Sequence, residues 1–137
     1  MDPQNLGYAA IQIAHNFGAA CVVGAPLFAL WPVRLRLAQQ RPLAWLVLVA
    51  WLAQAASGLG FGAASHAFYG RFPDIHGIAM GALVIKIACA ILATVLTLAY
   101  LVRSRRWMAA GCRRAWLALL ALGAIALTAA AFLRWFS

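Results

Sequence analysis

The chain has 137 residues, of which 66% are hydrophobic and only 9% are charged. Soluble domains carry roughly 45–50% apolar and about 25% charged residues, so this composition excludes an ordinary water-soluble fold and indicates a protein whose surface faces lipid. A net charge of +9 could suggest a nucleic-acid-binding protein. The basic residues, however, are grouped between long apolar runs, which is the pattern of a multi-pass membrane protein. We therefore expect no nucleic-acid partner.

Four apolar segments are long enough to cross a bilayer, which takes about 20 residues of helix. They predict helices at about 7–32, 43–65, 77–102 and 114–134. Residues 1–137 are therefore expected to form one all-α domain, an integral membrane bundle of four transmembrane helices. Pro42 is expected to open the second helix, because proline is tolerated at the first helical position.

The basic residues predict how the bundle is oriented. They are concentrated at 34–41 and 103–114, so the positive-inside rule places the loops 33–42 and 103–114 in the cytoplasm. Both termini and the loop 66–76 are then extracytoplasmic, and we expect a multi-pass protein of a bacterial inner (plasma) membrane. Four tryptophans near the predicted helix ends are expected at the membrane interface: Trp31, Trp107, Trp116 and Trp135.

Helical spacing places small and polar residues on one face of each of the first three helices. The intramembrane polar residues on these faces are Gln12, Asn16, Gln54 and Lys86, and they are accompanied by His15 and Ser57. We expect the three faces to meet inside the bundle. The fourth helix has few polar residues, so its expected role is packing and lipid contact.

The three histidines fall in the outer half of the predicted bundle. His15 lies inside the first helix, His66 ends the second, and His76 begins the third on the same face as Met80. Imidazole and thioether groups are ligands that suit Cu(I), so these four residues form a candidate metal set. The same histidines could instead hold a b-type haem, with His15 and either His66 or His76 as axial ligands. Loop histidines are also often merely solvated, which stays open for His66 and His76.

Lys86 is the charged residue nearest to the middle of a predicted helix. A lysine there costs about 2.5–3.5 kcal/mol on insertion scales. The chain has only two acids, Asp2 and Asp74, and neither lies within a predicted span. Lys86 must therefore be neutral, reach water by snorkelling, or meet an anion from elsewhere. A haem propionate, a lipid headgroup and a carboxylate of a partner subunit are the candidates.

Two segments resemble the CopD-like copper-resistance membrane proteins. One is Ile13-Ala-His15-Asn-Phe-Gly-Ala-Ala-Cys-Val-Val-Gly24, in which a histidine is followed by small residues and a glycine. The other is Gly81-Ala-Leu-Val-Ile-Lys86-Ile-Ala-Cys-Ala-Ile-Leu92, in which a lone lysine interrupts apolar residues. The resemblance implies a role in periplasmic copper handling and uptake.

Three functional hypotheses remain open. The first is a CopD-like protein that binds copper at its periplasmic face for transport or delivery, with Lys86 as a gate. The second is an electron-transfer subunit that holds haem b, with Lys86 near a propionate or a quinone. The third is a cofactor-free structural subunit of a respiratory or transport complex, or of a homo-oligomer. With two acids and no base relay beside a serine, we expect no catalytic residues.

Overall fold

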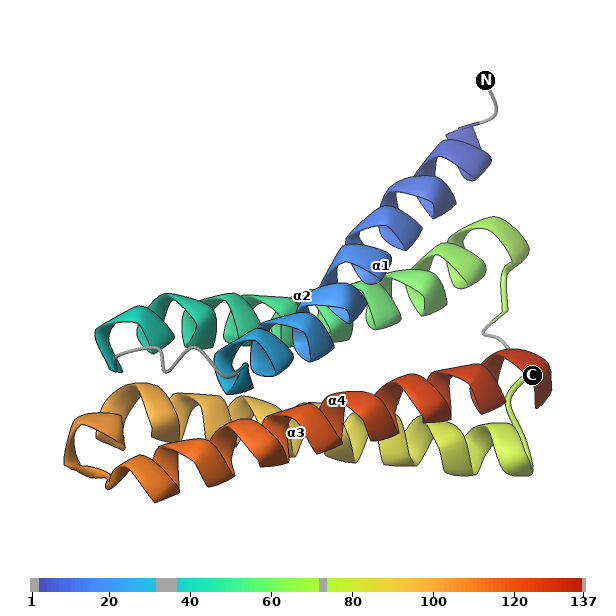
Figure 1. Ribbon diagram of the computed structural model, residues 1–137. Coiled ribbons are helices and arrows are strands. Elements are labelled where there is room, and N and C mark those ends of the chain that lie inside the picture. The colour runs from blue at the N-terminus through green and yellow to red at the C-terminus, as the bar shows by residue number, and fades with distance from the viewer. Residues whose placement is uncertain (1–2, 32–36, 72–73, 137) are drawn as a thin grey trace.

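The computed structural model describes residues 3–31, 37–71 and 74–136, which form an all-α four-helix bundle (Figure 1). The helices are α1 (Pro3–Leu30), α2 (Leu37–Tyr69), α3 (Ile78–Arg103) and α4 (Ala109–Phe136), with a short 3-10 turn, η1 (Ser104–Arg106), before α4. All four are long and apolar enough to span a membrane. The predicted all-α bundle of four membrane-length helices is thereby confirmed.

Three helices begin earlier than the sequence suggested: α1, α2 and α4. α2 begins at Leu37, so Pro42 lies inside the helix rather than at its first position. α4 begins at Ala109, so Arg113 and Arg114 belong to the helix. Hydropathy underestimates such helices, because arginine can keep its charged head in water while its stem lies along the helix. α1 begins at Pro3 and ends at Leu30, and the predicted end at Pro32 falls outside the described residues.

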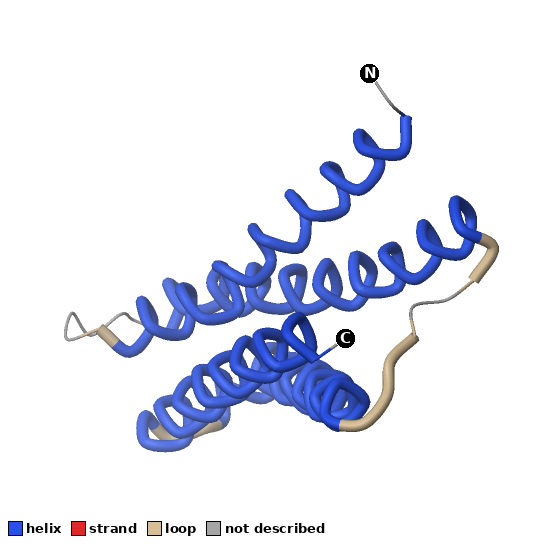
Figure 2. The backbone as a smooth tube through the Cα atoms, turned by 90° about the vertical axis from the view of Figure 1, so that its right-hand side faces the viewer, coloured by secondary structure: helices blue, strands red, loops and turns tan. Residues whose placement is uncertain are grey.

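The four helices are arranged as two hairpins, α1–α2 and α3–α4 (Figures 1 and 2). α1 ends, α2 begins and η1 joins α3 to α4 at one end of the bundle, which we call the basic end (Figures 1 and 2). Six arginines lie on the described parts of these elements: Arg41, Arg103, Arg105, Arg106, Arg113 and Arg114. At the opposite end, which we call the open end, α1 begins, α4 ends and the two hairpins diverge (Figures 1 and 2).

A hydrogen-bonded cluster joins the two hairpins near the basic end. Tyr100 of α3 donates its hydroxyl proton to Oε1 of Gln40 on α2. Nε1 of Trp116 on α4 donates to the same oxygen at 3.1 Å and lies 3.2 Å from the Tyr100 hydroxyl. Trp116 is only 1% exposed, so its predicted place at the membrane interface was wrong. Its indole N–H finds acceptors inside the protein instead, as most buried donors do.

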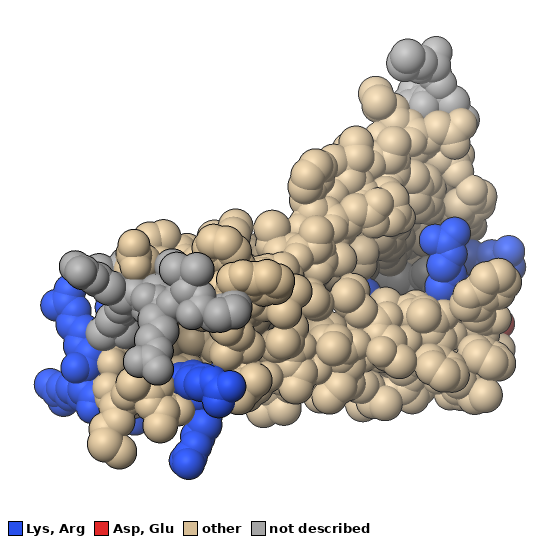
Figure 3. Space-filling view, viewed as in Figure 1, with Lys and Arg blue, Asp and Glu red and all other residues tan. Residues whose placement is uncertain are grey.

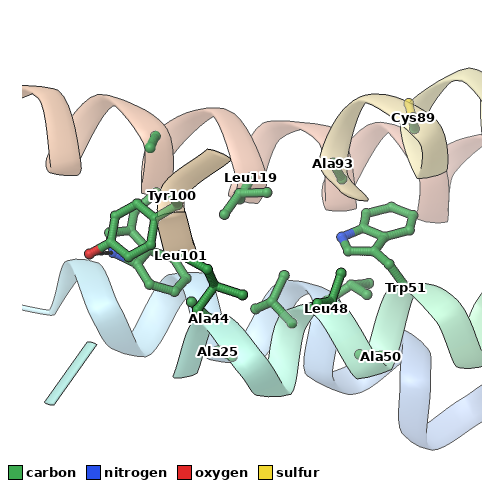
Figure 4. Packing of buried hydrophobic residues seen from close by; sticks show 14 of the residues in the cluster. Ala25, Ala44, Leu48, Ala50, Trp51, Cys89, Ala93, Tyr100, Leu101 and Leu119 are labelled. Atoms are coloured by element: carbon green, nitrogen blue, oxygen red, sulfur yellow. Dashed lines mark hydrogen bonds between the residues drawn. The ribbon is translucent and has the colours of Figure 1, made fainter. Parts of the chain in front are cut away.

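The apolar core fills the space between the hairpins beside this cluster (Figure 4). Trp51 of α2 is 2% exposed and reaches towards Ala93 and Cys89 of α3. Leu119 of α4 is fully buried in the same cluster. The core therefore holds the hairpins together in the half of the bundle that lies towards the basic end.

α1 and α4 approach each other closely at Gly123. A Cβ atom at this position would lie 2.8 Å from the carbonyl oxygen of Val22 and 3.1 Å from the side chain of Val23. The Val22 carbonyl has no helical N–H donor, because the residue four positions later is Pro26. The glycine thus lets the backbone of α4 come against a carbonyl that proline has left unpaired within its own helix.

We expect Gly123→Ala to destabilise the protein by about 1–3 kcal/mol, because the added methyl group meets backbone that has little room to move. The matched control is Gly58→Ala on α2, where a Cβ atom would meet nothing within 4 Å. An alanine there should leave stability unchanged or raise it slightly, since glycine is unfavourable within helices. Thermal unfolding in detergent checks both, and equal melting temperatures for the two variants would contradict the expected close contact.

Candidate intramembrane site

The ring of His15 on α1 connects three helices. Its Nδ1 atom is 2.7 Å from the hydroxyl oxygen of Ser57 on α2. Its Nε2 atom is 3.2 Å from the Nζ atom of Lys86 on α3. The ring is half-buried and meets Phe61 of α2 edge-on, with 5.7 Å between the ring centres. The two intramembrane ionisable residues singled out in the sequence are therefore direct neighbours.

The hydrogen bonds of Ser57 determine the tautomer of His15. The Ser57 hydroxyl is 2.6 Å from the carbonyl oxygen of Ala53 and 3.2 Å from that of Gln54. A carbonyl can only accept, so the single hydroxyl proton is donated within α2, and the oxygen accepts from His15. Nδ1 of His15 then carries the proton, and Nε2 presents a lone pair towards the Lys86 amine.

The backbone at His15 is also held in place. Gln54 is 7% exposed and donates from Nε2 to the carbonyl oxygen of His15. Gly18 makes room for this contact, because a Cβ atom there would lie 2.8 Å from the same amide nitrogen. The packing of Gln54 against α1 thus explains why residue 18, one turn after His15, is a glycine. Gln54 and Ser57 face the interior, as the sequence predicted.

Lys86 projects from the small-residue face of α3. The other members of this predicted face are buried, which confirms that it points inward: Ala79, Ala82, Cys89, Ala93 and Thr97. Lys86 itself is half-buried. Asp74, the one acid within the described residues, lies 2.9 Å from His76. Among the described residues, Lys86 makes its polar contact with the neutral imidazole of His15, which accepts through Nε2.

The other candidate ligands lie towards the open end. The side chain of His76 is 71% exposed, His66 is exposed at the end of α2, and Met80 is 45% exposed on α3. Among residues 3–31, 37–71 and 74–136, no three His, Cys, Asp or Glu side chains are close enough together to hold a metal ion. The histidines are thus placed in succession along the bundle rather than in one cluster.

Gln12 and Asn16 were expected to face the interior of the bundle, but the structure places them on its surface. Both are exposed, and Nε2 of Gln12 donates to Oδ1 of Asn16 at 2.7 Å. The reason is the path of α1, whose N-terminal part diverges from the α3–α4 hairpin and leaves this face uncovered (Figure 1). Hydropathy and spacing place residues on a helix face, but they do not tell where two helices part.

Comparison with models of protein families, with curated proteins and with solved structures finds no match for this chain. The function is therefore argued from the geometry of the site.

Proposed function

We propose that this chain is a membrane protein that binds copper near its periplasmic face, for transport or delivery, with His15 as the inner ligand. The observation that carries the proposal is the state of the His15 ring. Its Nδ1 atom lies 2.7 Å from the Ser57 hydroxyl, to which it donates in the tautomer argued above, and its Nε2 atom faces the Lys86 amine at 3.2 Å. Histidines that bind metals almost always donate their other ring N–H to a fixed partner, which orients the ring.

The choice of metal follows from the other available ligands. Met80, His66 and His76 lie between His15 and the open end of the bundle. Thioether and imidazole groups suit Cu(I) better than hard cations such as Mg²⁺ or Ca²⁺. Since these side chains do not form one cluster, we propose that a Cu(I) ion visits them in turn on its way to His15. The positive-inside rule places the open end outside the cytoplasm, which gives copper access from the periplasm.

Lys86 would act as the gate in this scheme. The atom that a copper ion must reach, Nε2 of His15, is the atom to which the Lys86 amine is directed at 3.2 Å. A protonated amine repels a metal cation and must move aside or lose its proton before the ion binds. Lys86 thereby separates the outer ligands from the interior of the bundle.

The test is a cofactor analysis of the protein purified in mild detergent. The sample is loaded with Cu(I), washed, and analysed for copper content, and a dithionite-reduced minus oxidised spectrum is recorded on the same material. The proposal expects equimolar copper and no haem band. A haem b band that is lost in His15→Ala would instead make this an electron-transfer subunit. The absence of both haem and copper would favour a structural subunit.

A further inference from the structure

The surface is hollowed between the outer half of α1 and the α3–α4 hairpin, and basic side chains lie at the rim of this hollow (Figure 3). α1 and α4 are in close contact at Val22 and Gly123, and towards the open end α1 leaves α4 (Figure 1), so we take this contact as the apex of the hollow. The contacts that the structure gives for α1 beyond His15 are made with α2. Tyr8 packs on Phe61 and Phe68, for example. The space between α1 and α4 therefore opens towards the surroundings of the bundle, which in a membrane are lipid.

The wall of the hollow on α1 is polar. Val23, which lies against Gly123, is followed outward on the same helix face by Ala19, Asn16 and Gln12, at the spacing of one, two and three turns. Asn16 and Gln12 are exposed. Their mutual hydrogen bond uses one amide hydrogen of Gln12. Each NH₂ group has two donors, so this wall still presents N–H groups to an acceptor.

The wall on α4 repeats this spacing with different residues. Outward from Gly123, the same face carries Leu127, Ala130 and Arg134, again at about one, two and three turns. Leu127 is 41% exposed and Arg134 is exposed near the end of the helix. An apolar strip thus leads from the apex of the hollow to a guanidinium group at its mouth.

The charge at the open end is positive. Arg134 lies in the last turn of α4 and Arg71 follows α2, whereas Asp74, the one acid of the described residues, is paired with His76. A ligand of this hollow should therefore combine an anionic group at the mouth, hydrogen-bond acceptors slightly deeper, and an apolar chain that reaches the apex. A phospholipid has these three features in this order.

We propose that the hollow is a binding site for one anionic phospholipid. Its phosphate is bound by Arg134, since guanidinium groups bind phosphate through paired charge-assisted hydrogen bonds. Its ester carbonyls accept from the amides of Asn16 and Gln12, and one acyl chain lies along Ala130 and Leu127. This site uses a different face of α1 from the Ser57 contact of His15, and the inference does not depend on copper binding.

The experiment reconstitutes the protein with equal amounts of dioleoylphosphatidylglycerol and dioleoylphosphatidylcholine, extracts it into mild detergent, and identifies the retained lipid by native mass spectrometry. The wild type should retain phosphatidylglycerol in preference to phosphatidylcholine. Arg134→Gln should reduce this retention at least about fivefold, as expected for the loss of a hydrogen bond between charged groups. The matched control, Arg114→Gln, removes an exposed arginine at the basic end and should retain the lipid.

A second variant tests the hollow without changing its charge. Leu127→Trp places a bulky side chain on the exposed strip and should also release the lipid, while size-exclusion profile and melting temperature stay close to those of the wild type. Equal retention by the Arg134→Gln and Arg114→Gln variants would overturn the proposal, as would equal retention of the two lipids. A lipid-free dimer would also overturn it, because a second copy of the chain would then fill the hollow.

Discussion

Replacement of His15 by alanine is expected to abolish copper binding, whereas His66→Ala or His76→Ala should only weaken it. His15 is singled out because each of its two ring nitrogens has a close polar neighbour on another helix. His15 is oriented by Ser57 and faces Lys86, while the His76 side chain is 71% exposed beside Asp74. Copper content after loading with Cu(I), and the affinity measured by competition with a Cu(I) chelator, check the expectation.

The matched control for His15→Ala keeps the ligand and removes its orienting partner. Ser57→Ala deletes the acceptor of the Nδ1–H group, and loss of such a partner typically costs 10–100-fold in metal affinity. We therefore expect Ser57→Ala to bind copper about 10–100-fold more weakly than the wild type, but still more tightly than His15→Ala. Circular dichroism and melting temperature establish that the variants are folded. Unchanged copper binding by folded His15→Ala would show that the metal is held elsewhere.

Lys86→Gln is expected to tighten Cu(I) binding by roughly tenfold or more, because it removes a positive charge from beside the ligand atom. Two unit charges 4 Å apart interact by about 4 kcal/mol at an effective dielectric constant of 20. The flexible lysine can swing away when the ion arrives, so only part of this energy should appear. About 1.4 kcal/mol already corresponds to a tenfold change in affinity. Titration against a Cu(I) chelator measures the difference.

The matched control is Lys86→Arg, which keeps the positive charge and should bind copper no more tightly than the wild type. If Lys86→Gln binds copper more weakly, the amine supports the ion rather than repels it, and the role of Lys86 as a gate is wrong. The same pair of variants separates charge from packing, since glutamine and arginine both retain a long side chain at this half-buried position.

The sequence was sufficient for the helices but not for the contacts between them. Four apolar runs predicted four helices, since lipid and protein interior both select the same apolar residues. Small residues on α3 correctly predicted its inward face. The contact between His15 and Lys86 could not be predicted, because it depends on how two hairpins cross, and residues 71 positions apart carry no local signal of it.

The missed features share a physical cause. The position of Trp116 near a helix end predicts an interfacial residue. Its burial is favourable because Gln40 and Tyr100 on other helices accept hydrogen bonds from its indole N–H. Gln12 and Asn16 lie on the face of α1 that the sequence predicted to be internal, but the divergence of α1 leaves them exposed. A proline inside the first span and a glycine inside the fourth were signals that could have been used. Pro26 frees the carbonyl of Val22, and Gly123 allows the backbone of α4 to approach that carbonyl.

The contact between Val22 and Gly123 has a mechanical consequence, because it lies between two arms of α1 of unequal length. About 20 residues separate Val22 from the start of the helix, which is roughly 28 Å of rise, against about 12 Å to its end at Leu30. A rotation about this contact therefore moves the outer tip of α1 more than twice as far as the inner tip. Each degree shifts the outer tip by about 0.5 Å over that length. Small adjustments of packing near the basic end are thus converted into larger changes in the width of the open end, with His15 carried on the long arm.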